Sequence, residues 1–498
     1  MLKRELIVTT IVSCFIIVGF IANVKAQTKT KLRCVVKQVN LEACAKPPAI
    51  EVFRSTVLKP EEGSSVTIEV NMDPRQEMDG IGGSFNELGW AALSSLPKAM
   101  KKQVLHDLFD TKKGAALRFN RIPIGASDFA RSAYSLDDST NDWSLEHFSI
   151  GRDETCLIRY IKAAQAINPQ MKFHASPWSP PGWMKSNGKQ TGGGELLSDD
   201  RTLQSHAQYL VKFLQAYHLH NINISRLCPQ NEPLVSGSYP GCKIPAILYA
   251  KAVKDFIIPA VAASGLSTEV WAGTFNYWRL ETRPHFDDLI KETTMANSVK
   301  GFSFQYTNMT WLKEFTAKYP QQPLQFSESE CYNGKNSLEE VLRDFQDFAA
   351  YTRAGIKLFT FWNMVLPEPH KSTWGWMQNS LVAIDSAKQT VVYEPSYALA
   401  KMIGSNIAPG DHYVNARITR GDDLIGALHY KPKDAVNFMQ TDLENGEQVV
   451  AFAKKNGKII ILLYNHGNET QANIILDKQT VQAALPAQKL VAIEIDKN

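Results

Sequence analysis

Residues 153–178 read DETCLIRYIKAAQAINPQMKFHASPW, a helix signal followed directly by a strand signal. From Leu157 onward, apolar residues recur at i, i+3, i+4 and i+7, the spacing of one face of an amphipathic helix. After the breaker Pro169, residues 171–177 form a short apolar run that is typical of a buried strand. The stretch therefore predicts a helix that leads into the next strand of a sheet, the unit from which α/β folds are built.

The same alternation continues from about residue 77 to residue 404. Strands are expected at 115–124, 171–177, 222–228, 269–275, 301–306, 323–326 and 356–362, and helices at 153–167, 202–217, 246–263 and 337–352. This pattern favours a parallel sheet with helical crossovers, and eight such units close into a (β/α)8 TIM barrel. The alternative is an open doubly wound sheet, but the glycine-rich residues 81–84 lack the G-x-G-x-x-G spacing of that fold.

The two ends of the chain differ from this central part. Strands are expected at 448–453, 458–464, 472–476 and 490–495, and residues 64–72 also alternate with a period of two. The sequence thus predicts an α/β protein with a side all-β sandwich domain, formed by the C-terminal segment plus an N-terminal strand. The expected divisions are a signal peptide at 1–26, an N-terminal segment at 27–76, the barrel at 77–404 and the sandwich at 405–498.

The first residues resemble an export signal. Lys3 and Arg4 precede an apolar stretch at 6–21, and the small residue Ala26 ends a tolerable cleavage pattern before Gln27. A membrane anchor is the alternative, but the stretch is short against the roughly 20 apolar residues that span a bilayer. Lipoprotein cleavage before Cys14 would leave a strongly apolar run on the mature protein. We therefore expect a secreted or periplasmic protein with no stable membrane span after cleavage.

The charged residues exclude some partners. The chain has 54 basic and 50 acidic residues, which are interleaved without long runs of one sign. Nothing in this pattern indicates binding to nucleic acid or to an anionic membrane surface.

Six cysteines remain after the expected cleavage, and Cys34 with Cys44 is the most plausible local disulfide. Six free buried thiols are an equal alternative. The chain has no C-x-x-C motif and no compact cluster of cysteine and histidine, so we expect no structural zinc site.

Two carboxylates come at the ends of expected strands, where barrel enzymes carry their catalytic groups. Glu232 follows the fourth strand, in the sequence CPQNEP, and Glu328 follows the seventh, in FSESEC. Alone, the first could be an ordinary helix-entry loop and the second a solvated acidic loop. Strands four and seven face each other across a barrel mouth, however, and a retaining glycosidase needs two carboxyl groups about 5–5.5 Å apart. The pair therefore predicts glycosidase chemistry.

At this point the chain resembles glycoside hydrolase family 30, the family of lysosomal glucosylceramidase and of several β-glycanases. The matching stretches are GIGGSF (80–85), RIPIGASDF (121–129), ASPWSP (175–180), NEP (231–233), FSE (326–328) and FWN (361–363). The resemblance covers the mature chain and implies the same barrel with its side sandwich. It further implies that Glu232 is the general acid/base and Glu328 the nucleophile, with Glu330 as the competing nucleophile.

The resemblance also implies a set of substrate-binding residues and no metal or organic cofactor. The residues are Asp128, Trp178, Asn231, Tyr306, Trp362 and, as a weaker match, Asn379. Asn231 should bind the sugar 2-hydroxyl, Asp128 hydroxyls on the far side of the ring, and Tyr306 the nucleophile. For three of them there is an alternative: Asp128 as a helix cap, Trp362 as barrel core and Tyr306 as plain packing.

The expected partner is a carbohydrate or glycoconjugate, hydrolysed in two steps at a β-linkage. The loops at 85–90 and 329–334 differ from those of glucosylceramidase-type members, so β-glucoside, β-1,6-glucan, β-galactoside, β-fucoside and xylan remain open. A silent carbohydrate-binding protein is the alternative of another class, because fold does not guarantee activity. Such a relative would be expected to have lost Glu232 or Glu328. The sequence does not separate endo from exo action, or hydrolysis from transglycosylation.

Overall fold

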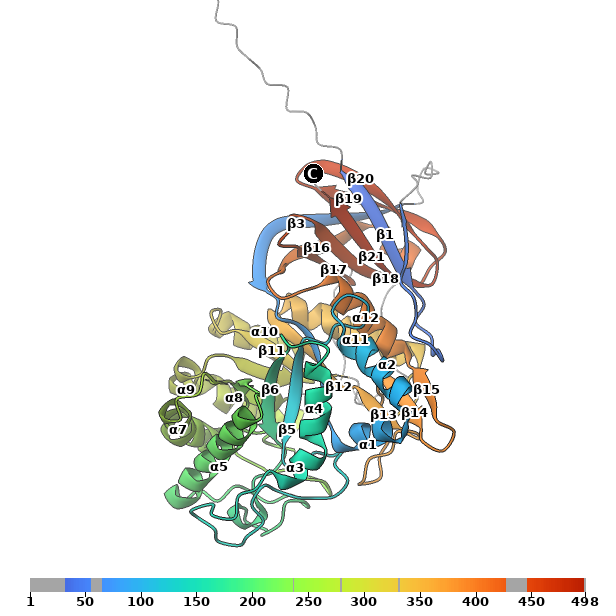
Figure 1. The fold of residues 1–498 in the computed structure, drawn as a ribbon. Coiled ribbons are helices and arrows are strands. Elements are labelled where there is room, and N and C mark those ends of the chain that lie inside the picture. The colour runs from blue at the N-terminus through green and yellow to red at the C-terminus, as the bar shows by residue number, and fades with distance from the viewer. Residues whose placement is uncertain are drawn as a thin grey trace, which may run out of the picture.

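The structure is a computed structural model that describes residues 32–54, 65–235, 237–277, 280–329, 332–426 and 446–496. It contains a parallel barrel, a nine-stranded all-β domain and a three-stranded sheet (Figure 1). The all-β domain combines blue and red strands in Figure 1 because both ends of the chain contribute to it. The expected signal peptide and Cys14 lie outside the described residues.

The barrel follows the order β8-β7-β6-β5-β4-β12-β11-β10-β9, with every neighbouring pair parallel. Its strands are β4 (Gly80–Ser84), β5 (Phe119–Ile124), β6 (Lys172–Pro177), β7 (Ile224–Leu227), β8 (Glu269–Val270), β9 (Ala272–Asn276), β10 (Phe302–Gln305), β11 (Leu324–Ser329) and β12 (Ile356–Asn363). Only Trp271 separates β8 from β9, so the two form one interrupted strand that closes a ring of eight. The predicted (β/α)8 barrel is confirmed.

Gly82 shows why the first barrel strand carries so many glycines. A Cβ atom added at Gly82 would lie 1.7 Å from the carbonyl oxygen of Phe119 in β5. No side chain can occupy that space, and glycine is the residue that permits such close backbone approach. The glycine at position 82 is therefore a requirement of the packing between β4 and β5.

Helices cover the outside of the barrel. They are α1 (Glu87–Ser95), α2 (Lys98–Phe109), α3 (Gly151–Thr155), α4 (Leu157–Gln165), α5 (Asp200–Leu219), α6 (Ala246–Lys251), α7 (Ile258–Ala263), α8 (Arg283–Lys291), α9 (Thr293–Ser298), α10 (Met309–Lys318), α11 (Leu338–Arg353) and α12 (Pro395–Asn406). The expected helix at 153–167 is divided at Cys156, where φ is −137°. The helix expected at 246–263 runs through a π-helical turn at Ala252–Ile257.

The all-β domain has the strand order β2-β1-β21-β18-β17-β16-β3-β19-β20. Its strands are β1 (Arg33–Val39), β2 (Glu51–Arg54), β3 (Ser65–Glu77), β16 (His412–Arg420), β17 (Val449–Ala453), β18 (Ile459–Asn465), β19 (Thr470–Leu476), β20 (Gln479–Leu485) and β21 (Lys489–Asp496). Strands from both ends of this order bury side chains in one hydrophobic core, so the sheet folds over on itself. The separate all-β domain is confirmed, whereas the exact domain boundaries stay predictions.

The N-terminal contribution is larger than expected. The predicted strand at 64–72 is β3, but β1 also pairs with β21 over seven residues and β2 pairs with β1. The sequence of β1, RCVVKQV, alternates poorly because polar residues interrupt both faces. A period-two search therefore misses it, and its pairing with β21 and β2 stabilises the extended conformation.

A third, small sheet follows the last barrel strand in the chain. It consists of β13 (Val365–Pro367), β14 (Val382–Asp385) and β15 (Thr390–Tyr393). Only Met364 separates β13 from β12, the eighth barrel strand, and residues 368–381 form the loop between β13 and β14.

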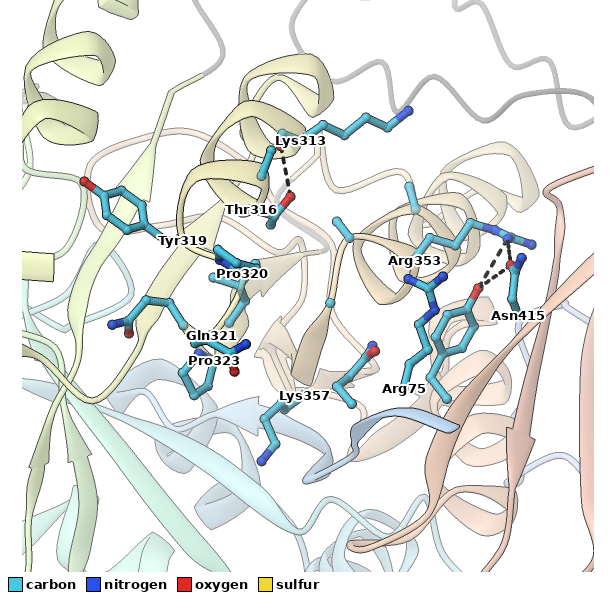
Figure 2. A pocket seen from close by; sticks show the side chains of 18 of the residues that line it. Arg75, Lys313, Thr316, Tyr319, Pro320, Gln321, Pro323, Arg353, Lys357 and Asn415 are labelled. Atoms are coloured by element: carbon cyan, nitrogen blue, oxygen red, sulfur yellow. Dashed lines mark hydrogen bonds between the residues drawn. The ribbon is translucent and has the colours of Figure 1, made fainter. Parts of the chain in front are cut away.

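Arg353 joins the barrel to the all-β domain at the end where the barrel strands begin. From the C-terminus of α11 it donates to Asn415 Oδ1 at 2.9 Å (Figure 2). It also donates to the carbonyl oxygens of Ala416 and Val449. A cavity of about 700 Å³ lies beside this contact, and its mixed polar and apolar lining includes Arg75 and Lys357. It is lined by the starts of β11 and β12, and so lies at the opposite end of the barrel from the strand ends discussed below.

The expected Cys34–Cys44 disulfide is wrong, because both thiols are free. Cys34 lies in β1 against the core of the all-β domain, and burial raises the pKa of its thiol to about 12. Cys44 lies beyond the end of β1 and pairs through its backbone with Tyr393 of the small sheet. Cys156, Cys228 and Cys242 are also free, and Cys331 lies outside the described residues.

None of the helices in the described part of the chain combines the length and apolar character needed to cross a bilayer.

Candidate active site

The two predicted carboxylates lie at the carboxyl ends of their strands. Glu232 follows β7, and Glu328 is the fifth residue of β11, one residue before that strand ends. Parallel barrel strands present these ends to one face of the molecule, where loops of different strands meet. Glu328 is 7% exposed. Glu330, the competing carboxylate, lies outside the described residues.

Arg121 is a central cation of this site, and its side chain is fully buried in β5. Its Nη1 contacts Glu328 Oε2 in an ion pair and donates to the Ser327 carbonyl oxygen at 3.2 Å. Its Nη2 donates to Asn231 Oδ1 at 2.6 Å and to Ser176 Oγ at 2.8 Å. A guanidinium in this position stabilises a charged Glu328 and fixes it relative to the loop that carries Glu232.

Asn231 is oriented by the same network. Its Oδ1 accepts from Arg121 Nη2 and, at 2.8 Å, from Thr274 Oγ1. Because both contacts use the oxygen, the amide Nδ2 is left as the group that can donate to a ligand. The backbone N–H of Asn231 is held by the Pro177 carbonyl oxygen at 2.7 Å.

Glu232 lies in a different electrostatic environment from Glu328. Burial is the main cause that raises its pKa above the ordinary value, against the lowering effect of Asn276, Gln305, Arg121 and Tyr239. Asn276 Nδ2 donates to Glu232 Oε1, and the Tyr239 hydroxyl is hydrogen-bonded to the same carboxyl group. The residue has a positive φ of 45°, in the left-handed region. Strained backbone of this kind is concentrated at functional sites.

Asp128 is the third carboxyl group of the site. Burial and the nearby charges of Glu328 and Glu232 raise its pKa well above the ordinary value. These influences place the three carboxyl groups close enough to interact. Its predicted alternative as a helix cap finds no support, because no helix in the described residues begins beside it.

Two tryptophans form an aromatic wall next to Asp128. The rings of Trp178 and Trp362 stack with centroids 4.8 Å apart and an angle of 25°. Arg121 lies over the Trp178 ring at 4.4 Å. Phe129 packs edge-on against Trp362. Flat apolar rings beside polar groups are suited to the mixed faces of a sugar.

Several buried polar atoms at this site have no hydrogen-bond partner within the described residues. They are Asp128 Oδ1, Asn276 Oδ1 and Trp362 Nε1. Native proteins leave few such atoms unsatisfied, and each one calls for an explanation. Two acceptors and a donor around an aromatic wall match a ligand that carries several hydroxyl groups.

The last two predicted residues differ from each other. Tyr306 follows β10, is buried and packs its ring edge-on against Phe326 of β11, near Glu328. Asn379 is fully buried, and its side chain accepts from the backbone of Gly334 at 2.9 Å and donates to Glu340. Its hydrogen-bonding groups are used inside the protein, so Asn379 braces the loop after β11 and we do not propose it as a substrate contact.

Arg121, Tyr239 and Asn276 were not among the predicted site residues. Arg121 could have been found, because a charge inside the apolar strand FNRIPI is buried and must be paired. Asn276 ends β9, a strand that the sequence indicated, but nothing marked its side chain. Tyr239 lies in the irregular segment between β7 and α6, where sequence patterns give no position in space.

Asp128 allows a test of the electrostatics. In the native state its raised pKa means that it binds a proton more tightly than in the unfolded chain, so its contribution to stability declines as the pH rises from its unfolded pKa of about 3.9. At pH 8 we expect Asp128→Asn to have a free energy of unfolding higher than that of the wild type by about 1 kcal/mol or more, and therefore a higher unfolding temperature. This advantage should disappear at pH 4. Thermal unfolding at the two pH values measures the effect.

Asp153→Asn is the matched control. Asp153 is also buried, and its pKa is raised to about 6, but its oxygens accept from the hydroxyls of Tyr134 at 2.7 Å and Tyr217 at 2.8 Å. An amide offers one acceptor oxygen in place of two, so this variant should be destabilised. Equal destabilisation of Asp128→Asn at pH 8 would contradict the electrostatic account of Asp128.

Comparison with known proteins identifies the family of the chain. Residues 78–385 match the family model described as "Glycosyl hydrolase family 30 TIM-barrel domain". Putative glucosylceramidase 1 of Caenorhabditis elegans is 36% identical over an alignment that covers 39% of this chain and 38% of that relative's length. An endo-1,6-β-D-glucanase of Trichoderma harzianum is 27% identical over 83% of this chain and 85% of its own. The structure of SrfJ from Salmonella typhimurium has the same fold, with a TM-score of 0.77 at 19% identity, covering 93% of this chain and 99% of its own.

Proposed function

This chain belongs to glycosyl hydrolase family 30, and from that premise we propose that it is a retaining β-glycosidase with Glu232 as general acid/base and Glu328 as nucleophile. The contrast between the two carboxyl environments carries this proposal. Glu328 contacts the Arg121 guanidinium, which stabilises its charged form, whereas burial raises the pKa of Glu232 and favours its protonated form. Two carboxyl groups with opposite preferences are what a glycosidase needs for an acid and a nucleophile.

The reaction would proceed in two displacements. Glu232 gives its proton to the oxygen of the leaving group while a Glu328 oxygen attacks the anomeric carbon, which forms a glycosyl-enzyme ester. Loss of its proton turns Glu232 into a base, and it then deprotonates a water molecule that attacks the same carbon. The ester bond to Glu328 breaks, Glu232 regains a proton, and the sugar leaves with its β configuration retained.

The surrounding residues would bind the sugar at the cleavage point. Asn231 Nδ2 would donate to the 2-hydroxyl, a contact that strengthens in the transition state. Asp128 would accept from hydroxyls on the far side of the ring, and Trp178 and Trp362 would supply the apolar wall. Tyr306, close to β11, would help to position Glu328. A binding-only protein would not need the opposite environments of Glu232 and Glu328.

We propose that the substrate is a β-1,6-linked glucan. The relative named an endo-1,6-β-D-glucanase aligns with 83% of this chain at 27% identity, and putative glucosylceramidase 2 aligns with 78% at 26% identity. The loops at 85–90 and 329–334, which differ from those of glucosylceramidase-type members, favour the glucan. The aromatic wall and the unpartnered polar atoms support a sugar ligand in either case. Hydrolysis of glucosylceramide is the second candidate, because several relatives carry that name.

The test is hydrolysis of β-1,6-glucan. The rate is measured by the release of reducing ends, and proton NMR identifies the anomer of the first products. We expect β-anomers to accumulate before mutarotation, and we expect slower turnover of β-1,3-glucan, xylan and glucosylceramide at equal concentration. Early α-anomers would contradict the retaining mechanism. Preference for glucosylceramide would overturn the substrate but not the mechanism, and binding without turnover of any substrate would support the carbohydrate-binding alternative.

A further inference from the structure

Glu368, His370 and Glu394 form a compact group at the end of the barrel that carries the proposed active site. Their nearest ligand atoms all lie within 4.8 Å of one another, and they are the one group of this kind found in the described residues. His370 Nε2 lies 4.0 Å from Glu368 Oε1 and 4.0 Å from Glu394 Oε1. Glu368 and His370 lie in the loop between β13 and β14, and Glu394 comes directly before α12.

The imidazole of His370 points an unused nitrogen into this group. The residue is 5% exposed, and among the described residues Nε2 has no hydrogen-bond partner. On the other side of the ring, Nδ1 lies 3.2 Å from the Gly334 carbonyl oxygen and 3.2 Å from Asn336 Nδ2. When Nδ1 donates its proton to that carbonyl, Nε2 presents a lone pair toward the two carboxylates. A backbone carbonyl behind the ring is the usual arrangement for a histidine that binds metal.

Within the described residues, neither Glu368 nor Glu394 caps a helix with its side chain. Glu394 is at the N-cap position of α12, but its side chain makes no capping hydrogen bond. Its side chain is buried beside that of Glu368. Glu368 is 44% exposed on its side chain, so solvent reaches the group from one side. The carboxyl oxygens of Glu368 and Glu394 and the unpartnered Nε2 of His370 thus face one another at a place that solvent can reach.

We propose that Glu368, His370 and Glu394 bind one divalent transition-metal cation, with Zn²⁺ as the first choice. One imidazole nitrogen with two carboxylate oxygens suits Zn²⁺ better than Ca²⁺ or Mg²⁺, which prefer oxygen ligands alone. In a tetrahedral zinc site, neighbouring ligand atoms are about 3.4 Å apart. The two 4.0 Å separations from His370 therefore need to contract by about 0.6 Å, and the two carboxyl oxygens, which lie within 4.8 Å of each other, by at most about 1.4 Å. Water would supply the fourth ligand on the exposed side.

The cation would connect three segments around the proposed active site. Asn336, whose amide contacts His370, belongs to the loop after β11 and accepts from the Ser380 backbone N–H at 3.0 Å. The loop that carries His370 also carries Trp376, whose ring packs 4.9 Å from Tyr239. Tyr239 in turn is hydrogen-bonded to Glu232. The site therefore ties the loop after Glu328 to the residues that surround Glu232, while its metal binding does not depend on any glycosidase activity.

The test is calorimetric titration of the chelator-treated full chain with ZnCl₂, with CaCl₂ as the comparison. We expect one Zn²⁺ per chain, a higher unfolding temperature with Zn²⁺ than without, and no comparable response to Ca²⁺. Glu368→Gln and Glu394→Gln should each weaken Zn²⁺ binding at least about tenfold. Glu368 is exposed, so its variant tests the site without a threat to folding. Co²⁺ should give a visible d–d absorption band that both variants lose.

Glu154→Gln is the matched control, because Glu154 also contacts a histidine, His220, at 3.1 Å but has no second carboxylate. It should bind Zn²⁺ as tightly as the wild type does. No stoichiometric binding by the wild type would overturn the proposal, as would binding that the Glu368 and Glu394 variants leave unchanged. In either event the three residues form no more than an ion-pair cluster.

Discussion

Replacing Glu328 by glutamine is expected to lower kcat/KM for an aryl β-D-glucoside by about 10⁴-fold or more, because an amide cannot form the glycosyl-enzyme ester. The substitution keeps the shape of the side chain but removes the negative charge that pairs with Arg121. Nitrophenol release by wild type and variant at equal enzyme concentration measures the loss. Substrate binding should survive in part, because Asp128, Asn231 and the tryptophan wall are unchanged.

Glu330→Gln is the control for this experiment, since Glu330 is the competing carboxylate in the same sequence SESE. It should retain kcat/KM within about tenfold, a difference of about 1.4 kcal/mol. In Glu328→Ala, azide can enter the space of the missing carboxylate and should restore turnover as an α-glycosyl azide. A large loss in Glu330→Gln, with activity preserved in Glu328→Gln, would reverse the assignment.

The barrel could be predicted from sequence because each of its units is a local pattern. The helix face of residues 157–164 and the apolar run at 171–177 are both readable in a short window, and repetition supplies the topology. The same reasoning placed Glu232 and Glu328 at strand ends. The β1 strand could not be found in this way, because its pairing with β21 joins segments from opposite ends of the chain.

The site was predicted less completely than the fold, for a similar reason. Glu232 and Glu328 belong to recognisable motifs, but the difference between them comes from residues on other strands. Arg121 reaches Glu328 from β5, and Asn276 reaches Glu232 from β9. The disulfide prediction failed because the ten-residue separation between Cys34 and Cys44 does not determine where each side chain points. One thiol faces the all-β core, and the other follows a segment that pairs with the small sheet.

The unpartnered atoms add a second kind of information that no sequence pattern contains. Asp128 Oδ1 and Trp362 Nε1 are buried and, among the described residues, without partners, so their burial lowers the stability of the fold. His370 Nε2 has the same character at the proposed metal site. In both places, the unsatisfied hydrogen-bonding atoms are the ones that a ligand would satisfy. Stability and function are therefore expected to oppose each other at Asp128.

Glu232→Gln is expected to lower kcat/KM on β-1,6-glucan by about 10² to 10⁴-fold, the range of general acid–base catalysis. The leaving group from glucan is a sugar alkoxide, which is a poor leaving group unless Glu232 protonates it. A nitrophenolate is a better leaving group and needs this proton less. The loss should therefore be smaller for aryl β-D-glucosides with acidic phenols. The measurement is kcat/KM for a series of aryl β-D-glucosides whose phenol leaving groups have increasing pKa. The dependence of kcat/KM on the pKa of the phenol should be steep in the variant and shallow in the wild type.

The pH dependence of kcat/KM tests whether Glu232 is the general acid. Glu232 acts in its protonated form, so wild-type kcat/KM should decline as the pH rises through the Glu232 pKa, which burial places above the ordinary value for glutamate. Glutamine has no proton to lose, so this decline at high pH should disappear in Glu232→Gln, while the decline at low pH, where Glu328 becomes protonated, remains. Azide should rescue Glu232→Ala with formation of a β-glycosyl azide, the opposite anomer to that expected from Glu328→Ala. A high-pH limb that persists in Glu232→Gln would assign the proton to another group, and Asp128, buried beside both carboxylates with its own pKa raised, would be the next candidate.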